Sequence, residues 1–75
     1  MSKIDLEQII SIVSKHIKVE AKNININSKS KDFYQWDSLA QVNIILEIEK
    51  KTNQEIGANK MGELTSIKSI VNHLK

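Results

Sequence analysis

The hydrophobic positions of this 75-residue chain fall mostly at helical spacing. In residues 2–17 the apolar side chains recur every three or four positions, which gives one face of a helix. Ser2 and Asp5 can cap this helix, and Asp5 places a negative charge near its first turn, where the helix dipole favours one. The apolar face consists of Leu6, Ile9, Ile10, Val13 and Ile17.

A second helix is predicted from about Ser38 to Thr52, in the most apolar part of the chain. Its hydrophobic face is wider than a single packing contact needs. The helix therefore either lies centrally in a bundle or turns part of this face towards a partner or ligand. The apolar positions are Leu39, Val42, Ile44, Ile45, Leu46 and Ile48.

The C-terminal part predicts two further elements. The stretch ANKMGE, residues 58–63, is expected to form one short helical turn, and a last helix is expected to start at Thr65 or Ser66. Four apolar positions of that last helix share one face: Ile67, Ile70, Val71 and Leu74. The chain has no proline and only two glycines, which favours helices. We therefore predict one domain over residues 1–75, an all-α, small four-helix bundle with three main helices and a short third one.

Between the first two helices lies a long polar segment, VEAKNININSKSKDFYQ. Ile24 and Ile26 alternate with asparagines, as in a short strand, but so small a chain offers no convincing pairing partner. We expect an ordered loop that these isoleucines anchor to the bundle, with Phe33 and Tyr34 packing near its end. A loop of this length in a compact domain is usually functional, or else it shows that an element has been assigned wrongly.

Composition excludes several classes of function. Without cysteine the chain can form no disulfide, thiolate nucleophile or zinc–thiolate cluster. It has no arginine and its lysines are scattered, so no nucleic-acid target is expected. The N-terminal stretch MSKIDLEQII has acids within its apolar pattern, unlike a signal peptide or membrane span. We expect a cytoplasmic protein without membrane insertion.

Catalysis by the chain itself is not expected either. His16 and His73 lie far apart, each late in a predicted helix, and no acids lie at metal-ligand spacing. The chain lacks a glycine-rich phosphate loop, and a bundle of this size has little room for a substrate pocket. We therefore predict no metal site, no catalytic residues and no enzymatic activity.

Ser38 can be interpreted in two ways. The run Ser38-Leu39-Ala40-Gln41 fits an S-x-x-Q capping box, in which the hydroxyl would contribute about 1 kcal/mol. Asp37 competes for the same cap and would leave Ser38 as the first helical residue with a free side chain. The unpaired N–H groups at a helix start also suit a phosphate ester. Residue types alone favour the cap.

A resemblance to a known family changes this balance. The run Asp37-Ser38-Leu39 followed by AQVNIILEIEK resembles the D-S-L motif and second helix of acyl carrier proteins. Glu55-Ile56 stands where that family often has an acid–isoleucine pair, and ANKMGEL stands at its short third helix. Thr65-Ser66-Ile67 is similar to the T-x-V start of its last helix. The resemblance covers nearly the whole chain and is most specific at residues 36–49.

The resemblance implies a carrier that holds acyl or aminoacyl groups as thioesters on a 4′-phosphopantetheine arm. Ser38 would be the attachment site, and the arm would come from coenzyme A. Asp37 would help a phosphopantetheinyl transferase position its metal and coenzyme A. The other implied partners are an acyl- or aminoacyl-loading ligase and an acyltransferase or synthase, and the carrier is expected to be a monomer.

The resemblance also implies a surface that partner enzymes recognise. Its apolar part would be Leu39, Val42 and Leu46, and Glu47 and Glu49 would contact basic patches on those enzymes. Trp36 could be a partner contact or a side chain that packs in the bundle.

The chain's charge points to one branch of the family. The net charge of +2, with Ala40 and Asn43 at positions often acidic in fatty-acid carriers, argues against a general fatty-acid carrier. The W-D-S-L start, with Trp36 in place of a common glycine, resembles stand-alone carriers of specialised pathways. Its partners are then expected to carry smaller basic patches and to bind with weak salt dependence. The alternative is an unmodified helical adaptor that docks a partner through the apolar face of the second helix.

Overall fold

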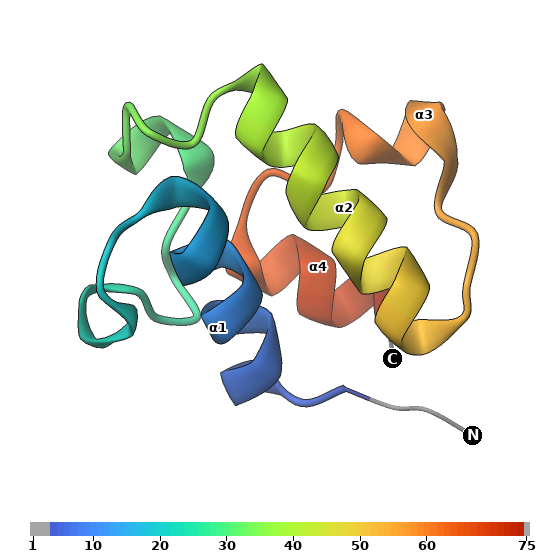
Figure 1. The fold of residues 1–75 in the computed structure, drawn as a ribbon, viewed down its shortest axis with the longest axis horizontal. Helices are drawn as coiled ribbons and strands as arrows, with labels where there is room; N and C mark the ends of the chain where they lie inside the picture. Colours follow the sequence, from blue (N-terminus) through green and yellow to red (C-terminus); the bar gives the residue numbers. More distant parts are fainter. Residues whose placement is uncertain (1–3, 75) are drawn as a thin grey trace.

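The computed structural model describes residues 4–74. Within them the chain forms four α-helices and two short 3₁₀ turns, and no β-strand. Figure 1 shows α1, α2 and α4 gathered around one centre, with the short α3 at the edge beside α2. The predicted all-α architecture with three main helices is confirmed. The helices are α1 (Leu6–Ile17), α2 (Ser38–Thr52), α3 (Gly57–Met61) and α4 (Ile67–Leu74), and the 3₁₀ turns are η1 (Ala21–Asn23) and η2 (Ser30–Asp32).

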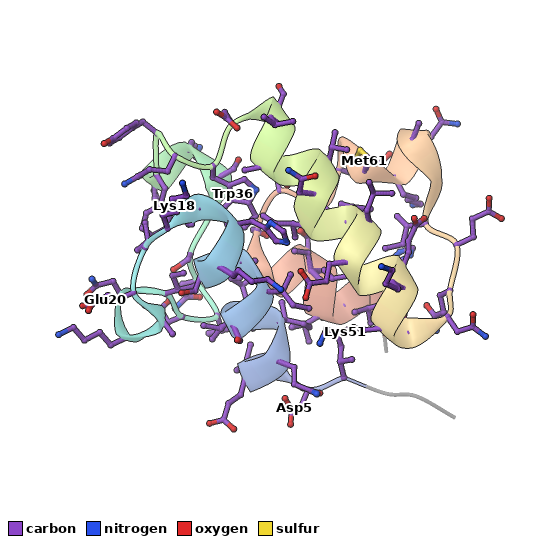
Figure 2. All side chains as sticks on the ribbon, in the orientation of Figure 1. Asp5, Lys18, Glu20, Trp36, Lys51 and Met61 are labelled. Atoms are coloured by element: carbon purple, nitrogen blue, oxygen red, sulfur yellow. The ribbon has the colours of Figure 1, made fainter. Side chains whose placement is uncertain are left out.

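Side-chain caps set where the helices begin. Asp5, labelled in Figure 2, precedes α1 and forms a reciprocal capping box with Gln8: Asp5 Oδ1 accepts the Gln8 N–H at 2.9 Å, and Gln8 Oε1 accepts the Asp5 N–H at 3.0 Å. Ser2, the other expected cap, lies outside the described residues. At α4, Ser66 Oγ accepts the Ser69 N–H at 3.1 Å, so the helix itself begins one residue later, at Ile67.

The core is built mainly from isoleucine contributed by three helices. Because isoleucine is branched at Cβ, few rotamers are open to it in a helix, and little side-chain freedom is lost on packing. The largest fully buried side chains are Ile9, Val13 and Ile17 of α1, Ile44, Ile45 and Ile48 of α2, and Ile67 and Ile70 of α4.

The wide apolar face of α2 is divided between the core and the surface. The isoleucines at 44, 45 and 48 are fully buried, whereas three other apolar side chains point outwards. Leu39 is 70% exposed, Leu46 52% and Val42 37%. The helix therefore lies centrally in the bundle, one of the two alternatives expected for it, and it also leaves apolar side chains exposed on its outer side.

The long segment between α1 and α2 is an ordered loop. Ile24 is buried, and Ile26 and Phe33 pack against the core, as expected. Tyr34, however, is 90% exposed, so its predicted packing is wrong.

Backbone hydrogen bonds tie this loop to the start of α4. Ser30 N–H donates to the Thr65 carbonyl at 2.7 Å, and Ile67 N–H donates to the Ser28 carbonyl at 3.0 Å. These two bonds make up the isolated antiparallel bridge between Lys29 and Ser66. The loop is therefore held at the end of the bundle where α2 begins.

Because Ile45 is buried and Leu46 exposed, truncating these neighbouring side chains of α2 should have different effects on stability. Ile45→Ala should lower the free energy of unfolding by about 2–5 kcal/mol, because it leaves a cavity in a closed core. Leu46→Ala, the matched control, should change it by about 0.5 kcal/mol, as is usual at the surface. Urea unfolding followed by circular dichroism measures both. Equal losses of unfolding free energy in the two variants would show that Ile45 is not buried and Leu46 exposed as the structure has them.

Candidate functional site

The start of α2 is capped by Asp37. Its backbone is extended, and its Oδ1 accepts the Ala40 N–H at 2.9 Å. Its carbonyl accepts the Gln41 N–H at 2.9 Å, the first bond of the helix. Ser38 is therefore the first helical residue, and the predicted Ser38–Gln41 capping box is wrong. The Asp37 carboxylate accepts the Ala40 N–H in the first turn, in place of the Ser38 hydroxyl. The Gln41 side chain is buried instead of reaching back to the helix start.

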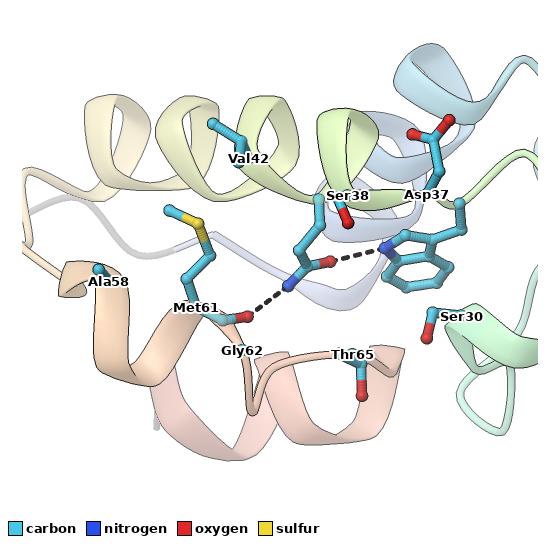
Figure 3. A pocket seen from close by; sticks show the side chains of 10 residues that line it. Ser30, Asp37, Ser38, Val42, Ala58, Met61, Gly62 and Thr65 are labelled. Carbon is cyan, nitrogen blue, oxygen red and sulfur yellow. Dashed lines mark hydrogen bonds between the residues drawn. The ribbon is translucent and has the colours of Figure 1, made fainter.

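This cap leaves the Ser38 side chain available. Ser38 is exposed, and its hydroxyl makes no hydrogen bond to any other residue between 4 and 74. In Figure 3 the hydroxyl oxygen lies on the side of α2 that faces a groove. Of the two interpretations of Ser38, the structure supports the free hydroxyl.

The groove beside Ser38 is open and has a volume of about 590 Å³. It runs between α2, α3 and the segment that leads into α4 (Figure 3). Its walls combine apolar and hydroxyl side chains, so it can accept a ligand with both kinds of group. Besides Ser38, the walls include Val42, Ala58, Met61, Ser30 and Thr65.

A buried polar pair forms the floor of this groove. Trp36 Nε1 donates to Gln41 Oε1 at 2.6 Å. Gln41 Nε2 in turn donates to the carbonyls of Met61, at 2.7 Å, and Leu64, at 2.8 Å. Trp36 is only 5% exposed and Gln41 9%. The burial of Trp36 supports packing in the bundle rather than a direct partner contact.

Gln41 is the residue of this region that sequence reasoning assigned wrongly. It was expected to reach back to the start of its helix, but it links α2 to the segment after α3. A signal was present in the sequence: Gln41 lies three and four positions before Ile44 and Ile45, on the buried face of the helix. A polar residue on that face needs internal hydrogen-bond partners.

The three apolar residues expected to contact partners lie on the outer side of α2. Leu39, Val42 and Leu46 are all at least one-third exposed. Leu39 directly follows Ser38, and Leu39, Val42 and Leu46 are three and four residues apart, so they share a face. The structure therefore brings Ser38 and this apolar surface together on one helix.

Glu47 joins α2 to α1. Its Oε2 contacts Lys15 Nζ at 2.8 Å and its Oε1 contacts His16 Nε2 at 2.7 Å, with Lys51 Nζ further away at 3.9 Å. Burial raises the pKa of Glu47, but hydrogen bonds and charge from Lys15 and His16 outweigh it and hold the pKa below its ordinary value. The carboxylate thus acts first as a link between two helices.

Glu49 joins α2 to α3. Its Oε2 accepts the N–H groups of Ile56, at 2.6 Å, and Gly57, at 3.2 Å, at the start of α3. A carboxylate in this place satisfies backbone donors that a helix start leaves unpaired. Both glutamates expected at the partner surface are therefore engaged in bonds within the bundle.

Two other kinds of site are not found in the described part of the chain. Among residues 4–74, no three histidine, cysteine or acidic side chains come close enough together to hold a metal ion. None of the helices in this range has the length and apolar character needed to cross a bilayer.

Comparison with known protein families identifies the chain. The family model described as "Phosphopantetheine attachment site" matches residues 7–74, nearly the whole sequence. The chain belongs to this family of carrier proteins. It is therefore a non-catalytic carrier of acyl or aminoacyl groups, with 4′-phosphopantetheine as its prosthetic group. A phosphopantetheinyl transferase modifies it, and enzymes that load and process the carried group interact with it.

The link from Glu47 predicts a pH dependence of stability. Because the folded-state pKa is lowered, the ion pair stabilises the fold fully above the ordinary value of 4.5 and is lost as the pH falls through the folded pKa. Glu47→Gln should lower the free energy of unfolding at pH 7 by about 0.5–1 kcal/mol, a modest loss because water screens the largely exposed Lys15.

Urea unfolding of wild type and variant between pH 7 and pH 3 measures this effect. The difference between the two proteins should shrink at the acid end of the range. Glu63→Gln is the matched control, because Glu63 is 67% exposed and, within residues 4–74, its ion pair is with Lys60, three positions earlier. If the difference in unfolding free energy between wild type and Glu47→Gln stayed constant with pH, the ion pairing of the Glu47 carboxylate would be contradicted.

Proposed function

We propose that Ser38 is the residue that carries the 4′-phosphopantetheine arm. The observation that supports this most strongly is the exposed hydroxyl, left free because Asp37 caps α2. In the modification Ser38 Oγ loses its proton and attacks the phosphate of coenzyme A that carries the pantetheine. The pyrophosphate bond of coenzyme A breaks, 3′,5′-adenosine bisphosphate leaves, and a phosphodiester joins Ser38 to the arm. When bound, the arm supplies a terminal thiol that holds the acyl group as a thioester.

The surroundings of Ser38 fit a phosphodiester and a flexible arm. The positive end of the α2 dipole lies at the first turn and favours a negative charge there. The groove provides space on the side of α2 where the hydroxyl lies. The chain thus positions the arm by its own fold, while the arm supplies the reactive group.

Asp37 is proposed to act in the modification as well as in the cap. Its Oδ1 is engaged with the Ala40 N–H, while the residue as a whole is exposed. The second carboxylate oxygen is therefore available to a divalent metal ion, which prefers oxygen ligands, in the transferase complex. Through that metal Asp37 would help to position coenzyme A.

We propose Leu39, Val42 and Leu46 as the apolar surface that partner enzymes contact. Those partners would be an acyl- or aminoacyl-loading ligase and an acyltransferase or synthase, with the carrier acting as a monomeric domain of residues 1–75. A cytoplasmic location and the absence of nucleic-acid targets remain predictions. The internal bonds of Glu47 and Glu49 reduce the negative charge open to partners, which supports weak salt dependence of binding.

An intact mass measurement tests the attachment site. Incubation of the purified chain with coenzyme A and a promiscuous phosphopantetheinyl transferase should add one phosphopantetheine, and fragmentation should place it on Ser38. Ser38→Ala should gain no mass. Ser30→Ala is the matched control: it removes another hydroxyl beside the same groove and should be modified like wild type.

The negative result is also informative. If the folded wild type gains no mass while a known carrier is modified in the same reaction, Ser38 is not an attachment site. The same conclusion follows if Ser38→Ala is still modified.

A further inference from the structure

The Trp36–Gln41 pair separates the groove beside Ser38 from the interior of the bundle. Both side chains line the groove, and they are joined by the hydrogen bond from Trp36 Nε1 to Gln41 Oε1. Gln41 is also bonded to the carbonyl of Met61, and dashed lines in Figure 3 mark these two bonds. Ile44 and Ile45, the next buried positions of α2, are fully enclosed. The groove and the isoleucine core are therefore divided by a polar floor.

A chain that entered the core from the groove would have to move this floor. Moving it would separate α2 from the segment at residues 61–64 and break both bonds donated by Gln41 Nε2. The Trp36 N–H would also lose its acceptor. An alkyl chain offers no hydrogen bond in return, so buried polar groups would be left unpaired, which is strongly unfavourable.

The groove above the floor suits a different occupant. Its apolar wall is formed by Val42, Ala58 and Met61, and the hydroxyls of Ser30 and Thr65 lie on its other side. Such a mixed, open surface can hold an arm that contains amides and a small terminal group. Because the groove is open, a long alkyl chain lying in it keeps one side in contact with water, which the hydrophobic effect disfavours.

We propose that this carrier keeps its cargo in the surface groove, outside the core, and that the cargo is a short or polar acyl group. The polar floor of Trp36 and Gln41 excludes long alkyl chains from the interior. This inference rests on the proposed attachment of the arm to Ser38. It names a class of cargo that neither the fold nor the family determines.

The test loads the modified chain with either a butyryl or an octanoyl group. Cleavage of each thioester by hydroxylamine reports whether the acyl group is accessible to solvent. We expect equal rates for the two groups in wild type. In ¹³C-methyl spectra, the change from butyryl to octanoyl should shift Val42 and Met61 at the groove, whereas Ile44, Ile45 and Ile70 should not move.

A double variant tests the floor itself. Trp36→Phe with Gln41→Leu removes the donor and its acceptor together, so that the Trp36–Gln41 pair is replaced by apolar side chains. In this variant octanoyl should enter the core and be cleaved at least about tenfold more slowly than butyryl, a factor that corresponds to ~1.4 kcal/mol. Thr52→Val is the matched control, because it removes a buried hydrogen bond to the Ile48 carbonyl away from the groove, and it should behave like wild type.

Several results would overturn the proposal. Slow cleavage of octanoyl in wild type, or shifted methyl signals of the core isoleucines, would show that the octanoyl chain enters the core. Both are measured on the wild type, without any variant. Equal cleavage rates for butyryl and octanoyl in a folded double variant would show that the Trp36–Gln41 floor does not exclude the octanoyl chain from the core. Absence of the arm from Ser38, by contrast, would refute the attachment site and is detected by mass before any loading.

Discussion

The hydrogen bond from the Ala40 N–H to the Asp37 carboxylate determines how the start of α2 is used. A helix start has several unpaired donors, and a serine in the cap position would be held by one of them. Here the acid occupies that position and the serine follows it. The hydroxyl of Ser38 is therefore not needed as a cap. It still lies at a fixed place, the positive end of a helix that packs against the core. Exposure and rigid placement are combined in a single residue.

The rest of the structure maintains that placement. The buried isoleucines of α2 pack in one core cluster with those of α1 and α4, and Glu47 and Glu49 add polar links to α1 and α3. Gln41 joins the same helix to the segment before α4. Bonds in three directions thus hold α2, while its outer face remains open along Leu39, Val42 and Leu46. A carrier needs this combination, because partner enzymes must find the arm at a defined place on a recognisable surface.

Periodicity was enough to predict the helices, because their apolar faces recur at regular spacing and the core is built from them. It also predicted that Ile24 anchors the loop. It could not choose between Asp37 and Ser38 as the cap, since both side chains can accept the same N–H group. The carbonyl partners of Gln41, the α1 partners of Glu47 and the N–H partners of Glu49 were beyond prediction for another reason. They lie 7 to 32 positions away in sequence, and only the fold brings them together. Phe33 and Tyr34 were both expected to pack, but only Phe33 lies against the core, whereas Tyr34 is exposed.

The most direct test of this account is a comparison of the unfolding free energies of Ser38→Ala and Asp37→Ala, measured in urea. The account predicts that Ser38→Ala stays within about 0.5 kcal/mol of wild type, as expected for an exposed side chain without a structural bond. Asp37→Ala should lose about 1 kcal/mol, the usual contribution of an N-cap. The opposite order, a loss at Ser38 and none at Asp37, would show that the serine is the cap and would remove the free hydroxyl on which the proposed function depends.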